Sequence, residues 1–131
     1  MLAPVLAVTP HPAGQVLGYS GFRLARDSRI ASLALGYADG LPEAFWQNAP
    51  QLRIAGQNCP VLPDLSMMQC FVDVTDLPAA AVTPGTEAEV FGTAPDLNHF
   101  AAGLGLKPNY LLTQIGGLCH RRYVTHLPGD C

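Results

Sequence analysis

Two tyrosines are the side chains of this chain best placed to carry chemistry, because each stands beside glycines at the end of an apolar run. Tyr19 lies in the segment Leu17–Gly21, and Tyr37 lies in the segment Leu35–Gly40. Each phenol is expected to project from a strand end beside a flexible turn, where binding and catalytic groups gather. Alternatively, each ring packs against the bare backbone of its glycine neighbours, and composition alone favours that packing role.

The other groups that could act as a nucleophile, a base or a metal ligand are isolated in the sequence. Lys107 is the only lysine. It stands in a turn, which is a poor place for the buried amine that Schiff-base chemistry favours. No cysteine or carboxylate stands at metal-ligand spacing from a histidine, so we expect no metal site. The cluster His120–Arg122 could contact an anion, although so short a basic run is usually a solvated surface.

Composition predicts one folded domain over residues 1–131. The chain is 49% hydrophobic and 13% charged, which is enough to bury one core and argues against disorder. The net charge of −3, with seven lysines and arginines, provides no basic surface for nucleic acid. No apolar run approaches the roughly 20 residues of a membrane-spanning helix. Four cysteines without a C-x-x-C pair, and no secretory signal, indicate free thiols in a soluble, cytoplasmic protein.

Short apolar runs between turn signals predict a mainly β domain, a small barrel or sandwich of about seven or eight short strands with two short helices. The clearest hairpin joins residues 52–54 to 59–62 through a four-residue connection at 55–58. A type II turn at 83–86 predicts that the next strand starts near Glu87. The remaining strands are expected at residues 5–8, 16–23, 29–35, 70–74, 87–91 and 122–125.

Helix signals are confined to a few places. Asp96 is suited to be the N-cap of a helix over residues 97–104, which has apolar residues on one face and ends at Gly105. A second helix is expected over residues 108–114, because proline is tolerated in a first helical turn. A single helical turn is expected at residues 42–45.

The sequence GYADG at residues 36–40 is a specific motif that stands in order between Gly18-Tyr19 and Ser66–Gln69. In this order the segments resemble the C-terminal domain of alanine racemases, over roughly Leu2 to Val124. The other segments that fit the family's order are 26–33, 58–61, 71–76, Pro84-Gly85, Asn109-Tyr110 and 113–116.

The resemblance implies two domains that share one active site. Members of the family have an N-terminal β/α barrel, which binds pyridoxal phosphate on a lysine, followed by a mostly β domain of this kind. Racemisation needs a base on each face of a planar carbanion. In the family the bases are that lysine and a tyrosine from the partner subunit's C-terminal domain, which corresponds to Tyr19. Tyr37 resembles the tyrosine that narrows the substrate entrance, and Met67 resembles the residue whose backbone amide holds the substrate carboxylate.

The departures from the family pattern fall mainly on the active-site side of the domain, as relaxed catalytic demand would produce. Met68 stands where the family has an aspartate, so a thioether that cannot balance a cation replaces a carboxylate. Pro63-Asp64 stands where Gly-Arg is common, which reverses a charge. The stretch 19–26 is one residue short, and Leu118–Arg121 keeps only the last arginine of an Arg-Val-Pro-Arg run.

The resemblance implies the C-terminal domain of an alanine racemase-like enzyme, which interconverts L-alanine and D-alanine. The chain would supply Tyr19 and its substrate contacts to a pyridoxal-phosphate barrel on another chain or in a missing segment, and would be inactive alone. The alternative is a non-catalytic interaction or assembly module, in which Met68 has removed the chemistry. A free-standing enzyme is the weakest interpretation, because no residue anchors the cofactor. An isolated copy would expose apolar surface, which favours a homo-oligomer.

Overall fold

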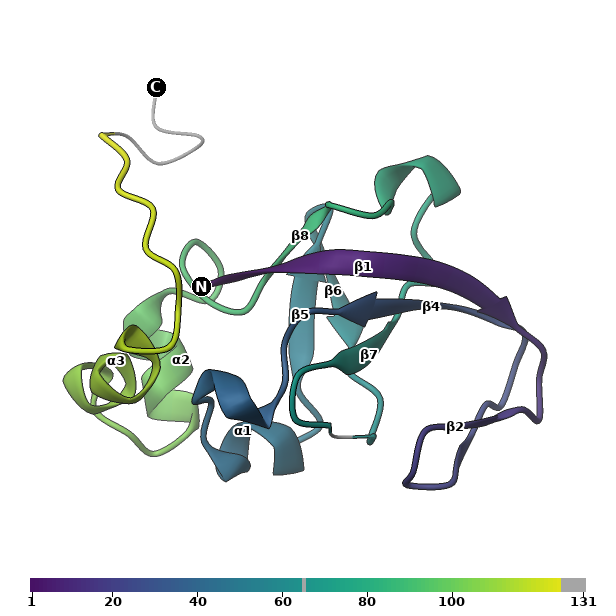
Figure 1. The fold of residues 1–131 in the computed structure, drawn as a ribbon, viewed down its shortest axis with the longest axis horizontal. Helices are drawn as coiled ribbons and strands as arrows, with labels where there is room; N and C mark the ends of the chain where they lie inside the picture. The colour runs from purple at the N-terminus through teal and green to yellow at the C-terminus, as the bar shows by residue number, and fades with distance from the viewer. Residues whose placement is uncertain (65, 126–131) are drawn as a thin grey trace.

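A computed structural model describes residues 1–64 and 66–125 (Figure 1). The described residues form a mainly β fold, as predicted, with one six-stranded antiparallel sheet and a separate two-stranded hairpin. The strands are β1 (Leu2–His11), β2 (Val16–Leu17), β3 (Phe22–Arg23), β4 (Ser28–Leu33), β5 (Gln51–Ile54), β6 (Gln57–Pro60), β7 (Cys70–Asp73) and β8 (Glu87–Glu89). The strand order in the large sheet is β6-β5-β8-β1-β4-β7.

The large sheet curls until its two edge strands meet. Just beyond β6, Val61 forms an antiparallel bridge with Val72 of β7. The N–H of Leu62 also donates to the carbonyl of Phe71 at 2.8 Å. The long strand β1 pairs with β8 through its first residues and with β4 through its later ones, with a register shift between Val5 and Ala7. These contacts close the sheet into a small barrel, one of the two arrangements, barrel or sandwich, that the short strands predict.

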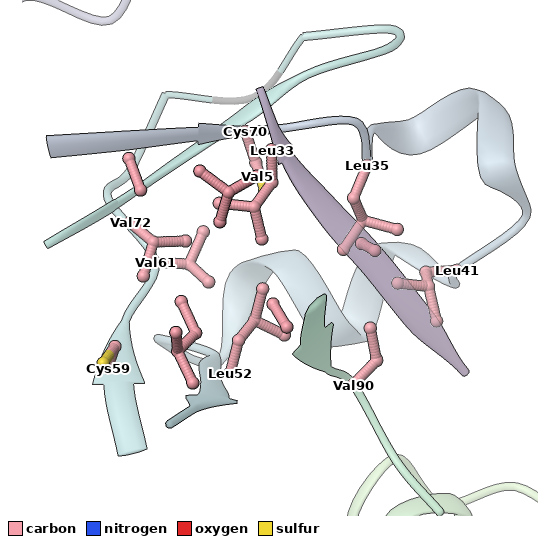
Figure 2. Packing of buried hydrophobic residues seen from close by; sticks show 14 of the residues in the cluster. Val5, Leu33, Leu35, Leu41, Leu52, Cys59, Val61, Cys70, Val72 and Val90 are labelled. Carbon is pink, nitrogen blue, oxygen red and sulfur yellow. The ribbon is translucent and has the colours of Figure 1, made fainter. Parts of the chain in front are cut away.

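The barrel interior is filled by alternate side chains of the strands, since successive residues of a strand point to opposite faces. Leu33, Leu52 and Val72 are fully buried. Figure 2 shows Val5, Leu33, Val61 and Val72 pointing toward one another between the strands. A separate, smaller buried cluster lies under the β2–β3 hairpin, and it consists of Leu17, Leu24, Ile30 and Leu62.

The helices lie together at one end of the barrel, away from the β2–β3 hairpin (Figure 1). Stacked rings join them to the sheet, with Phe100 lying 5.7 Å from Phe45 and 4.9 Å from Phe91 between ring centroids. No helix of the described residues is long and apolar enough to cross a membrane. The helices are α1 (Glu43–Gln47), α2 (Leu97–Gly103) and α3 (Pro108–Gly116), and the 3-10 turns are η1 (Tyr37–Asp39) and η2 (Ala79–Ala81).

Capping and turn signals in the sequence are confirmed. Asp96 caps α2 by accepting a hydrogen bond from the N–H of His99 at 2.9 Å. Gly105 follows this helix with a left-handed φ of 69°. In the turn before β8, Gly85 has a φ of 94°, as the second central residue of a type II turn requires. The strand then begins at Glu87, where the turn predicts it.

Three details of the strand predictions are wrong. The hairpin between β5 and β6 turns through two residues, because Gln57 already pairs with Ile54 and leaves only Ala55 and Gly56 in left-handed conformations. The expected strand at 16–23 is two short strands, because the chain reverses between β2 and β3. No strand forms at 122–125: the Arg122 guanidinium lies 3.7 Å from Glu87 of β8, but the backbone of these residues pairs with no described strand.

Candidate functional site

Tyr19 stands at the tip of the β2–β3 hairpin and points into solvent. Gly18 and Gly21 flank the tip with φ values of 60° and 73°, which reverse the chain in conformations that favour glycine. Tyr19 is 98% exposed, so its ring does not pack against the glycine backbone. Of the two alternatives that the sequence left open, the projecting phenol is therefore the one observed at Tyr19, and the packing role that composition alone favoured is wrong there.

The backbone of this tip is held by a carboxylate from a distant part of the chain. Asp64 is 4% exposed, and its Oδ1 accepts hydrogen bonds from the N–H groups of Tyr19 at 2.9 Å and Ser20 at 3.1 Å. The sequence identified Asp64 only as a reversed charge. No local pattern indicates this role, because the bonds span more than 40 residues of chain.

Tyr37 begins the turn η1 and is fixed through backbone groups. Its N–H donates to the carbonyl of Ser66 at 3.2 Å, and the N–H of Ala38 donates to the carbonyl of Met67 at 2.9 Å. A Cβ atom on Gly36 would lie 2.3 Å from the Met67 carbonyl oxygen, so only glycine permits this approach. The Tyr37 side chain is about half-exposed. The structure thus brings the Tyr37 turn and the backbone of Met67 together.

One connection, the β6–β7 loop, holds both tyrosine-bearing turns through its described residues 61–64 and 66–69. Asp64 of this loop binds the Tyr19 turn, and Met67 binds the Tyr37 turn. Among the described residues, no acceptor for the N–H of Met67 is found. Met68, beside it, is largely exposed. The three predicted site residues therefore share one support, although they come from separate segments.

Charged groups reinforce the base of the β2–β3 hairpin. The guanidinium of Arg26 donates two hydrogen bonds to Asp76, at 3.0 and 2.9 Å. These bonds hold the pKa of the Asp76 carboxyl below its ordinary value. On the other side of the hairpin, Asp27 accepts a hydrogen bond from the N–H of Ala13 at 2.8 Å. Carboxylates therefore fix the hairpin at its base as well as at its tip.

The cysteines of the described residues are not suited to nucleophilic chemistry. Burial raises the pKa of the Cys70 thiol to about 12, so this group stays protonated at neutral pH. Burial also raises the pKa of Cys59 and of Cys119. These three residues form no disulfide with one another. The raised pKa disfavours the thiolate form of each of these three residues.

Comparison with known protein families decides which family this chain belongs to. Residues 1–123 match the family described as the alanine racemase C-terminal domain. This chain belongs to that family. The biosynthetic alanine racemase of Mesorhizobium japonicum is 36% identical over 129 residues, which cover 96% of this chain and 32% of that protein. The alanine racemase of Acidiphilium cryptum is 40% identical over 117 residues, 88% of this chain and 32% of that protein.

Solved structures show the same relation for the fold of this alanine racemase domain. The alanine racemase of Bartonella henselae, solved with covalently bound pyridoxal phosphate, matches with a TM-score of 0.81 and 30% identity. The match covers 94% of this chain and 34% of that one. The alanine racemase of Streptomyces lavendulae matches with a TM-score of 0.78 and 26% identity, over 96% of this chain and 33% of that one. This chain thus spans about a third of the length of its relatives.

The racemase domain described here does not fit a pyridoxal phosphate site of its own. Such a site needs an amine for the covalent bond and donors for the phosphate. Lys107 is exposed at the N-cap of α3. Two hollows on the described surface, one beside Asp73 and the other beside Arg29, contain neither a lysine nor a tyrosine. Among residues 1–64 and 66–125, no group of three or more metal-ligating side chains occurs either.

Proposed function

We propose that this chain is the part of an alanine racemase that completes an active site on a separate pyridoxal-phosphate barrel. The observation that carries the proposal is the exposure of Tyr19 on a fixed backbone. Its side chain is 98% exposed, while the buried carboxylate of Asp64 binds its backbone N–H. A phenol held out into solvent by a fixed turn is suited to meet a surface that lies outside this chain. The barrel belongs to another chain or to a further segment of the same protein.

Tyr19 serves as one of the two bases that racemisation requires. Its Oη takes a proton from the α-carbon of alanine in one direction of the reaction and returns one in the other. A phenol has an ordinary pKa near ~10, so cationic groups of the barrel must favour its ionised form at neutral pH. The bound cofactor supplies the electron sink for the carbanion.

Met67 and Tyr37 hold and admit the substrate. The N–H of Met67 donates to the carboxylate of a small amino acid, while its carbonyl stays bound to Ala38. A backbone donor suits this role because substitution of the side chain leaves it in place. The half-exposed ring of Tyr37, whose turn is bound to the backbone of Ser66 and Met67, narrows the path by which the substrate enters. The proposal includes a cytoplasmic location and assembly into an oligomer.

The test is to titrate the 131-residue chain into the remaining, cofactor-bearing part of the Mesorhizobium japonicum racemase. Alanine racemisation and cofactor absorbance are recorded together. Activity is expected only in the mixture, and Tyr19→Phe should lower it by about 10²–10⁴-fold, as removal of a general base does. The matched control is Tyr123→Phe, since Tyr123 is also an exposed tyrosine. If the Tyr19→Phe mixture racemises alanine as fast as the parent mixture, the role of Tyr19 is wrong.

A second candidate function is a non-catalytic module that binds a barrel without completing its chemistry. The exposed Met68 favours it, because a thioether offers neither charge nor a strong acceptor at the loop that holds both tyrosines. Binding of the chain to the barrel without racemisation, in the same titration, would support this candidate over the first.

A further inference from the structure

We infer that Asp64 is a positioning residue for Tyr19, whose buried carboxylate holds the Tyr19 backbone so that the phenol reaches the substrate at one place. The inference rests on the proposed role of Tyr19 as a base. It assigns a function to a residue that touches neither the reacting atoms nor the phenol itself.

The contacts of Asp64 are concentrated on one atom. Its Oδ1 accepts hydrogen bonds from two successive N–H groups, those of Tyr19 at 2.9 Å and Ser20 at 3.1 Å. Hydrogen bonds from backbone N–H groups to a carboxylate are stronger than those between neutral groups. The two bonds fix the peptide planes on both sides of the Tyr19 Cα atom. They therefore restrict the direction in which its side chain leaves the hairpin.

Asp64 is itself anchored to the core. Its N–H donates to the carbonyl of Leu62 at 2.8 Å, and Leu62 belongs to the small buried cluster under the hairpin. The same cluster contains Leu17, the residue before Gly18. The carboxylate is thus tied to the packed part of the molecule and transmits that rigidity to an exposed tip.

The Asp64 carboxylate occupies the space that a side chain at position 18 would take. A Cβ atom on Gly18 would lie 1.6 Å from Oδ2 of Asp64 and 2.0 Å from its Cγ. The two groups cannot share that space. The close approach of the carboxylate to the Tyr19 turn therefore depends on a glycine at position 18, as well as on the acid at position 64.

Tyr19 needs such a support because packing does not supply one. At 98% exposure its ring has no neighbours to hold it, and only the backbone sets its position. A misplacement of about 1 Å in a reacting group can cost about 10²-fold in rate. A looser tip would present the phenol over a wider range of positions and lower the fraction that reacts.

The geometry separates hydrogen bonding from charge. Both bonds use Oδ1, so an asparagine can accept them through its single carbonyl oxygen. Asp64→Asn therefore keeps the support and removes the charge, whereas Asp64→Ala removes both. Asp27→Ala is the control, because Asp27 also accepts from a backbone N–H but at the base of the hairpin, at Ala13.

The kinetic test uses the mixture of this chain with the cofactor-bearing part. Asp64→Ala should lower kcat about ten- to a hundredfold with KM changed much less, and Asp64→Asn should restore most of the loss. In the Tyr19→Phe background, Asp64→Ala should cause no further loss, because it acts through Tyr19. Full additivity of the two losses, or an Asp64→Asn variant as poor as Asp64→Ala, would overturn the inference.

A second measurement uses this chain alone, without the cofactor-bearing part of the racemase. Hydrogen exchange of the Tyr19 and Ser20 amides, followed by NMR, should be slow in the parent and in Asp64→Asn and fast in Asp64→Ala. Equal exchange in all three chains would overturn the inference. If instead Tyr19→Phe keeps full activity while these exchange rates differ as expected, the proposed role of Tyr19 fails and Asp64 still holds its turn. The two failures are therefore distinguishable.

Discussion

The turn that carries Tyr19 is fixed by a side chain, whereas the turn that carries Tyr37 is fixed by backbone groups. Asp64 supplies both acceptors for the first, through one carboxylate oxygen. The carbonyls of Ser66 and Met67 supply those for the second. Both supports come from the β6–β7 loop, yet only the first can be removed by replacing the residue that provides it.

This difference predicts how each turn responds to change. A backbone contact persists through substitution of the residue that makes it, and is disturbed mainly where a side chain is added to the facing glycine. A side-chain contact can also be lost by truncation. The Tyr19 turn should therefore be the more sensitive of the two to mutation.

Gly18→Ala, in the Tyr19 turn, should cause the largest loss of unfolding free energy. The new Cβ would displace the Asp64 carboxylate, 1.6 Å away, and would also adopt a left-handed φ. Lost charge-assisted bonds, about 1.5–3 kcal/mol, and left-handed strain, about 1–2 kcal/mol, both destabilise the fold. The measurement is urea unfolding beside Gly21→Ala, where φ is also positive but the Cβ meets nothing within 4 Å. Equal losses in the two variants would show that Asp64 does not support the turn.

Gly36→Ala is the matching change in the Tyr37 turn. Its φ of −142° suits any residue, so the effect is steric alone, with the new Cβ 2.3 Å from the Met67 carbonyl oxygen. We expect a loss of about 1–3 kcal/mol, as for other overpacked sites. Gly103→Ala in α2 is the control and should be neutral or stabilising, because its Cβ would meet no neighbour. A Gly36→Ala chain as stable as the parent would contradict the close approach of the two backbones.

Met68→Asp restores the residue that the family resemblance implies next to Met67. Because Met68 is exposed, the change should leave the fold intact. It should raise racemisation in the reconstituted mixture by about tenfold or more, the effect of one hydrogen bond to a charged group. Met67→Leu is the control, since its proposed contact uses the backbone N–H. An unchanged rate in Met68→Asp would mean that other departures limit the activity.

The smallest effect concerns the ion pair at the base of the Tyr19 hairpin. Arg26 lowers the pKa of Asp76 through its hydrogen bonds, so the pair stabilises the fold above the ordinary pKa of an aspartate. That contribution is lost as pH falls through the lowered pKa of the folded state. Both side chains are exposed, so the loss should be slight. Unfolding free energy measured against pH should fall less steeply in acid for Asp76→Asn, and an identical slope would contradict the assignment.

The fold could be predicted from the sequence wherever the signals are local. Short apolar runs between turn signals identify most of the strands, Asp96 identifies the start of α2, and a Pro-Gly pair identifies the turn before β8. The strand expected at 122–125 failed because apolar content says nothing about whether a partner strand lies nearby. Pairing is a property of the whole sheet, and the backbone of residues 122–125 pairs with no described strand even though Arg122 lies beside Glu87 of β8.

Only part of the candidate site could be proposed from the sequence. Tyr19, Tyr37 and Met67 could be identified through motifs that resemble a family. Asp64 could not, because its importance lies in two hydrogen bonds to residues more than 40 positions away. In the sequence, Asp64 is an aspartate that follows a proline. Only the folded structure shows that its carboxylate binds the backbone of the Tyr19 turn.

The most direct test of the central claim is exchange of the alanine α-hydrogen with solvent deuterium in the reconstituted mixture. Two bases on opposite faces of one carbon should each handle the proton of one enantiomer. With Tyr19→Phe, we predict that racemisation is lost while exchange persists for one enantiomer of alanine and stops for the other. Exchange that continues equally from both enantiomers would contradict Tyr19 as the second base.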